Sequence, residues 1–223
     1  QPQEGVAIRS IGFVVDEICK PDPGKCKVID FVDGDRFVSF SDFANGKTSF
    51  ALDGVYKPEQ FIANKEMIQN YGMETVDDLL QGFNSSWIAM GMTGSEKTSF
   101  LFGKDSYLFQ NEKPYLLGSV ANELFNRIEH DKNENKAREG RIYISAKDLE
   151  TGDDLLFDQL DCKDEESCLS QFHHLKDFHE FQSSLDEAFI ASYARVWSDA
   201  NPIDNHCLMC VQLRVVQVKN DGT

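Results

Sequence analysis

A short segment near the middle of the chain constrains the fold more than any other. Residues 86–90 (SWIAM) have the composition of a buried strand, and the loop GMTGSEKT at 91–98 leads into a helix that we expect to begin near Lys97. A strand, a G-x-x-x-x-G-K-[ST] loop and a helix form the phosphate-binding P-loop, whose backbone N–H groups surround the phosphates. The first glycine, the lysine and the threonine of that pattern are present, as Gly91, Lys97 and Thr98.

The second glycine of the pattern is replaced by Glu96. Glycine lets the backbone approach a phosphate without a Cβ, whereas a glutamate adds bulk and negative charge. Two like charges about 4 Å apart repel by about 4 kcal/mol at an effective dielectric of 20. We therefore expect either no cofactor or weakly bound ATP or ADP with Mg²⁺, with Thr98 as the metal ligand. The loop residues that would hold it are Gly91, Thr93, Gly94, Ser95, Lys97 and Thr98.

The order of patterns along the chain predicts a single α/β domain with a mixed sheet over residues 1–223. We expect strands in 6–15 and 26–52, the latter with a hairpin turn at 33–35, and a helix over 58–80 that breaks at Gly72. Residues 131–140 and 162–171 are polar, 152–161 resemble a turn and short helix, and no repeat or linker divides the chain. Further elements are helices over 114–130 and 176–197 and strands over 141–149 and 206–218.

The charge balance excludes some partners. The chain has 38 acidic and 22 basic residues, a net charge of -16, which repels nucleic acid and anionic membranes. It has no run of 18 apolar residues, and its first residues, QPQEGVAIRS, lack the layout of a signal peptide. We expect neither nucleic acid nor a membrane as a partner.

Three groups contain metal-binding residue types at unfavourable spacings. Cys207 and Cys210 form a C-x-x-C in an apolar run, which suits buried thiols better than zinc or redox chemistry. Three histidines lie close together in the sequence, at His173, His174 and His179. They lack the H-E-x-x-H spacing of a zinc site, so we expect a solvated or interface cluster rather than a metal site. An acidic run at 153–166 lacks the calcium-loop pattern and suits a solvated face.

The surroundings of the loop resemble the kinesin motor core. The matching stretches are FALDGVY at 50–56, Gln60, VDDLLQGFN at 76–84 and IAMGMTGSEKT at 88–98, and more diffuse matches follow at 117–125 and 142–156. The resemblance implies the kinesin and myosin P-loop core, a twisted, mostly parallel mixed sheet flanked by helices. It also implies a cytoplasmic, cytoskeletal location. The sequence at 50–56 is similar to that of cilia-associated kinesins, which suggests a location in the ciliary axoneme.

Several residues of the family's nucleotide site do not carry over. Of the adenine-binding R-x-R-P stretch only Arg9 remains, and Asn64 stands where a base-stacking tyrosine is usual. The first switch, S-S-R-S-H, corresponds to 202–206, where only His206 is kept and Asp204 replaces the arginine. The second switch, D-x-x-G-x-E, does not occur after His206. These groups sense and hydrolyse the γ-phosphate, so we assign no catalytic residue.

The resemblance also implies later strands that flank the P-loop strand, and we expect these to be omitted here or supplied separately. Without them the chain would expose apolar strand edges. Our hypothesis is a non-motile kinesin-like head, a structural or binding module in a microtubule-based assembly or beside an active kinesin partner. The alternative is a divergent kinesin ATPase whose second switch and microtubule-binding part lie outside this segment. A third possibility is a protein that binds nucleotide only for structure.

Overall fold

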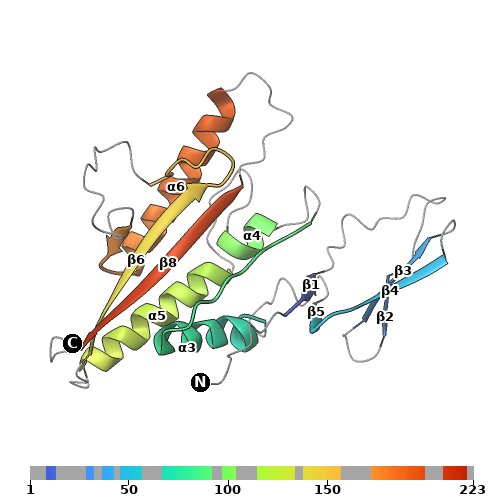
Figure 1. Ribbon diagram of the computed structural model, residues 1–223, viewed down its shortest axis with the longest axis horizontal. Coiled ribbons are helices and arrows are strands. Elements are labelled where there is room, and N and C mark those ends of the chain that lie inside the picture. Colours follow the sequence, from blue (N-terminus) through green and yellow to red (C-terminus); the bar gives the residue numbers. More distant parts are fainter. Residues whose placement is uncertain are drawn as a thin grey trace, which may run out of the picture. The chain divides into compact units, whose positions relative to one another are not determined.

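The computed structural model describes residues 9–13, 29–32, 37–42, 46–56, 67–91, 97–103, 115–133, 138–156, 172–198 and 208–219. The chain divides into two compact units, whose helices and strands are labelled in Figure 1. Unit 1 comprises 1–70 and 87–116, and unit 2 comprises 71–86 and 117–223. One continuous head over 1–223 stays a prediction.

Unit 1 contains two small sheets. In the first, β1 (Ile11–Phe13) pairs in parallel with β5 (Gly54–Tyr56). In the second, β2 (Ile29–Val32), β3 (Phe37–Asp42) and β4 (Gly46–Ala51) form an antiparallel meander. The predicted hairpin is confirmed, whereas β5 was not expected as a separate strand.

The helical stretch that links the units changes type along its length. It begins with a π-helical turn, η2 (Ile68–Gly72), and continues as α3 (Met73–Gln81). The predicted break at Gly72 is wrong, because Gly72 keeps right-handed helical angles of φ -68° and ψ -41°. The helix ends at Gly82, whose φ of 90° allows its N–H to donate to the carbonyl of Leu79 at 3.1 Å. The part of this helix predicted over 58–66 lies outside the described residues.

Unit 2 is built around a three-stranded antiparallel sheet in the order β7-β6-β8. The long strands β6 (Arg138–Asp148) and β8 (Met209–Lys219) pair along all 11 residues, and β7 (His173–Leu175) pairs with the middle of β6. Two helices accompany the sheet: α5 (Leu116–Asn133), which enters unit 2 at Leu117, and α6 (Phe178–Ser198). These elements confirm the helices and strands predicted over 114–130, 141–149, 176–197 and 206–218.

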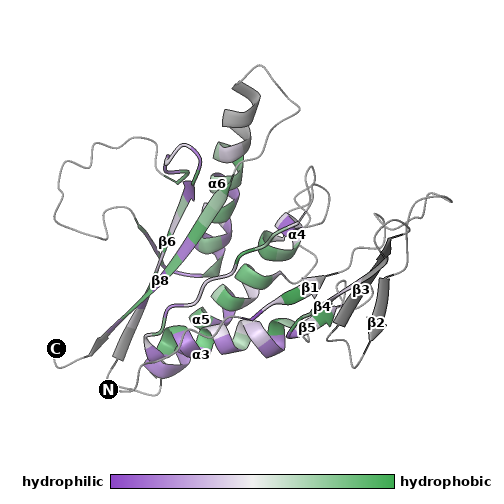
Figure 2. Ribbon diagram, turned by 45° about the vertical axis from the view of Figure 1, so that its right-hand side comes forward, coloured by the Kyte–Doolittle hydropathy of each residue, from purple (hydrophilic) through white to green (hydrophobic). Residues whose placement is uncertain are grey.

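The core of unit 2 lies between one face of β6 and α6. Ile142, Ile144 and Ala146 of β6 are at most 1% exposed, and Phe181 and Ala188 of α6 are fully buried. Figure 2 shows hydrophobic residues along these strands and helices beside hydrophilic ones. The 3.6-residue period of α6 thus buries one apolar face against a strand whose alternate residues point the same way.

Two sequence-based boundaries need correction. The loop predicted over 131–140 is wrong at both ends, because α5 continues to Asn133 and β6 starts at Arg138. Within 152–161, residues up to 156 form a turn with one isolated bridge, Lys147 to Asp154, and the predicted short helix falls outside the described residues, as does 162–171.

The apolar run 86–90 is not a buried strand, contrary to expectation. The structure assigns no helix or strand to residues 83–91, and Ile88 and Met90 are 83% and 87% exposed. Trp87 and Ala89 between them are half-buried. An apolar strand is buried only when neighbours pair with its edges, and none of the described strands pairs with this run. No helix in the described part of the chain is long and apolar enough to span a membrane.

The first turn of α6 is capped by two acidic side chains. Glu180 N–H donates to Asp177 Oδ1 at 2.8 Å, and the carboxylate of Glu180 accepts the N–H of Lys176 at 2.7 Å. The second hydrogen bond, more than the neighbouring charge of Lys176 and the contact with His173, lowers the pKa of Glu180 below its ordinary value of 4.5.

We expect Glu180→Gln to lower the free energy of unfolding at pH 7 by about 0.5–1 kcal/mol, a typical capping contribution. Because the folded-state pKa lies below the unfolded one, the ionised carboxylate stabilises the fold above pH 4.5, and this is lost as pH falls through the folded pKa. Urea titrations from pH 7 to pH 3 should show the two proteins converging. Glu187→Gln, at an exposed site on α6, is the control; a constant difference for Glu180→Gln would contradict the prediction.

Candidate functional site

The described residues include both ends of the P-loop-like segment. Gly91 closes the apolar run with φ 157°, a region of backbone space used almost only by glycine. Lys97 and Thr98 are the first two residues of α4 (Lys97–Phe102), as predicted, with Lys97 half-buried and Thr98 exposed. Thr93, Gly94, Ser95 and Glu96 lie outside the described residues, so binding at the loop stays a prediction.

Local packing fixes the position of α4 within unit 1. Phe100 is buried, and the helix ends at Gly103, whose N–H donates to the carbonyl of Ser99 at 2.9 Å. A Cβ at residue 103, where φ is 72°, would lie 2.4 Å from the ring of Tyr115. Glycine is therefore needed there, and the close approach fixes where the helix that carries Lys97 ends.

Arg9, the remaining residue of the predicted adenine site, is exposed and lies two residues before the start of β1. The next residue is tied to the turn before β5: Ser10 N–H donates to Asp53 Oδ2 at 2.7 Å, and Asp53 N–H donates to the carbonyl of Ser10 at 2.8 Å. This exchange sets the register of the β1–β5 pair. Asn64 and the first-switch segment 202–206 lie outside the described residues.

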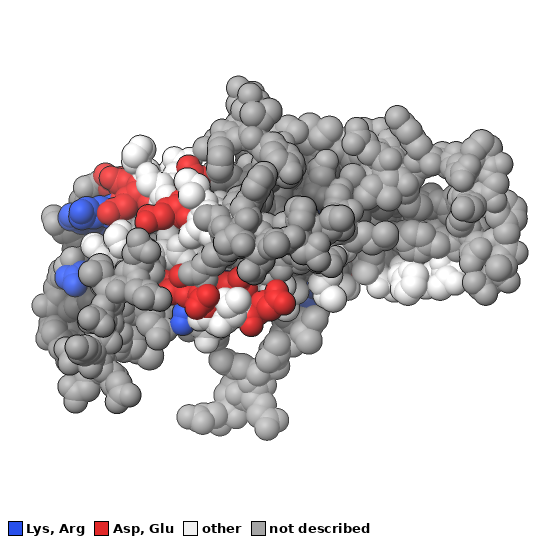
Figure 3. All heavy atoms as spheres, turned by 90° about the horizontal axis from the view of Figure 1, so that it is seen from above, with Lys and Arg blue, Asp and Glu red and all other residues white. Residues whose placement is uncertain are grey.

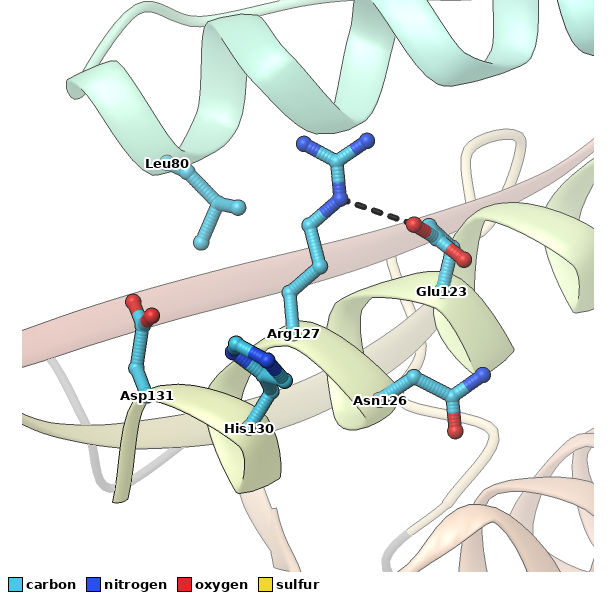
Figure 4. Close-up of a pocket in the computed structure, with 6 residues that line it drawn as sticks. All are labelled: Leu80, Glu123, Asn126, Arg127, His130 and Asp131. Carbon is cyan, nitrogen blue, oxygen red and sulfur yellow. Dashed lines mark hydrogen bonds and ion pairs between the residues drawn. The ribbon is translucent and has the colours of Figure 1, made fainter. Parts of the chain in front are cut away.

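Unit 2 has an open pocket between α3 and α5 that the sequence did not indicate (Figure 4). Its volume is about 450 Å³, and its lining is Leu80, Glu123, Asn126, Arg127, His130 and Asp131. Arg127 Nε donates to Glu123 Oε1 at 2.8 Å, and Arg127 Nη1 donates to Asp77 Oδ1. Hydrogen bonds to Glu123 first and Asp77 second raise the pKa of Arg127, so this arginine joins the two helices as a fixed cation.

A double-mutant cycle of Arg127→Met and Asp77→Ala should show a coupling energy of about 0.5–1 kcal/mol, the value of a partly exposed ion pair. Asp78→Ala in place of Asp77→Ala should couple by less than about 0.3 kcal/mol, since Asp78 is not bonded to Arg127 in the described contacts. Urea unfolding at low salt measures both, and equal coupling for the two aspartates would contradict the geometry.

The described histidines and cysteines that were considered as possible metal ligands do not gather into a metal site. His173 Nε2 lies 3.5 Å from Glu180 Oε1, whereas the ring of the next residue, His174, packs in a tilted arrangement against Tyr143, with ring centres 5.1 Å apart. Neighbouring histidines of β7 therefore face opposite ways. Cys210 is a half-buried free thiol in β8, and Cys207 lies outside the described residues. Within the described ranges, no group of three or more His, Cys, Asp or Glu residues could hold a metal ion.

Three comparisons with known proteins each find a similarity to kinesins. The kinesin motor domain family model matches residues 35–198. Kinesin-like protein KIN-12A of Arabidopsis thaliana is 31% identical over 121 residues, which are 52% of this chain and 9% of that protein. A solved structure of a fast kinesin superposes with a TM-score of 0.70 at 16% identity, covering 97% of this chain and 62% of the other.

The structural likeness shows the fold and confirms the α/β class. The described residues contain both parallel and antiparallel strand pairs, in three separate sheets. The chain spans less than two thirds of the length of either protein.

Proposed function

Because the chain belongs to the kinesin motor-domain family, we propose that it acts as a non-motile kinesin-like domain, a structural or binding module in a microtubule-based assembly. The solved relative is described by its ATPase mechanism and its interactions with microtubules. Our proposal keeps the microtubule context and omits the ATP-driven motion.

Glu96 carries this proposal. It stands between Ser95 and Lys97, where a phosphate-binding loop has glycine. A carboxylate there would oppose each phosphate oxygen that the start of α4 attracts, and one such pair at about 4 Å is worth about 4 kcal/mol at an effective dielectric of 20. That is a loss of about three orders of magnitude in affinity, which turns a micromolar site into a millimolar one.

Two further sequence features support the same conclusion. Asp204 replaces the arginine that would pair with a second switch, which reverses the charge at that position. The net charge of -16 opposes tight binding to an acidic surface such as that of a microtubule. We therefore expect a partner protein of the assembly, or an active kinesin chain, to provide its attachment. We propose that the protein is located where this microtubule-based assembly is, and more specifically in a cilium.

The second candidate is a divergent kinesin ATPase, and retained features of the loop favour it. Gly91 has its glycine-specific backbone angle, and Lys97 and Thr98 stand at the first turn of a helix, where they would reach the outer phosphates and Mg²⁺. If this reading is right, Glu96 turns toward solvent and the missing switch groups come from elsewhere.

Titration with a fluorescent ATP analogue in Mg²⁺ separates the two. The non-motile domain should show no saturation below about 1 mM, and microtubules should not stimulate ATP hydrolysis by it. A micromolar dissociation constant together with stimulated hydrolysis would establish the ATPase. Micromolar binding without hydrolysis would leave a nucleotide that serves structure only, and it would also contradict the role assigned to Glu96.

A further inference from the structure

We draw no further inference here: the strongest candidate, the edge of β8 that no described strand pairs with and along which Val211, Leu213 and Val215 stay half-buried, carries nothing because the structure does not show what covers it, and the acidic side chains that gather on the face shown in Figure 3 have no second feature beside them that points to a ligand.

Discussion

Replacing Glu96 by glycine should raise the affinity for an ATP analogue with Mg²⁺ by at least about tenfold and by as much as three orders of magnitude. The lower figure allows for a side chain that turns into solvent, and the upper figure is the full repulsion of about 4 kcal/mol between one carboxylate and one phosphate charge. The gain requires that Lys97, Thr98 and the first turn of α4 are already arranged for a phosphate. Fluorescence titration at fixed Mg²⁺ measures it.

Glu96→Gln separates the two physical contributions. The amide keeps the bulk and removes the charge, so it should recover most of the gain if repulsion dominates and little if the Cβ and its substituents block the approach. Glu129→Gln, on the exposed surface of α5, changes the net charge equally and should leave the affinity unchanged. If Glu96→Gly binds no better than the wild type, the carboxylate is not the cause of weak binding.

Phe181→Ala should lower the free energy of unfolding of unit 2 by about 3–5 kcal/mol, the range for a large buried aromatic residue. Phe181 is fully buried, its ring stacks on Phe178 with centres 5.6 Å apart, and its helix covers the apolar face of β6. Truncation removes the transfer free energy of the ring and leaves a cavity that a packed sheet cannot close. Urea unfolding followed by far-ultraviolet circular dichroism measures the change.

The control for this variant lies on the same helix. Ile190 is 59% exposed, so Ile190→Ala removes a large apolar side chain without opening a cavity and should cost less than about 0.5 kcal/mol. A loss below about 1 kcal/mol for Phe181→Ala would mean that α6 is not packed on β6 in solution.

Long periodic segments were predicted well because their patterns are local. The amphipathic period of 176–197 and the apolar run of 206–218 each give an element within two or three residues of its observed bounds. Three-residue strands such as β5 and β7 are too short to show a period of two, and the histidines of β7 suggested a cluster instead. The continuation of the helix through Gly72 reflects packing that overrides the low helix propensity of glycine.

Burial of 86–90 could not be predicted from composition, because it depends on partners distant in sequence. The run has the residues of a central strand, yet Ile88 and Met90 face solvent where no described strand lies beside them.

The candidate site also has a part that could be predicted from the sequence and a part that could not. The loop could be recognised because its chemistry is confined to 91–98, whereas Arg127 binds Asp77 from a position 50 residues away. The spacing of Glu123 and Arg127 is the one signal of that pocket in the sequence.

The long ladder between β6 and β8 has a consequence for how the chain is made. Its two strands are separated by about sixty residues, and a ribosome adds about 5–20 residues per second. During synthesis, the apolar side chains of β6 therefore lack their partner strand for several seconds, until β8 emerges from the exit tunnel. Chaperones that hold extended apolar segments should bind nascent chains in which β6 but not β8 has left the exit tunnel, and should release them once residue 219 is also outside.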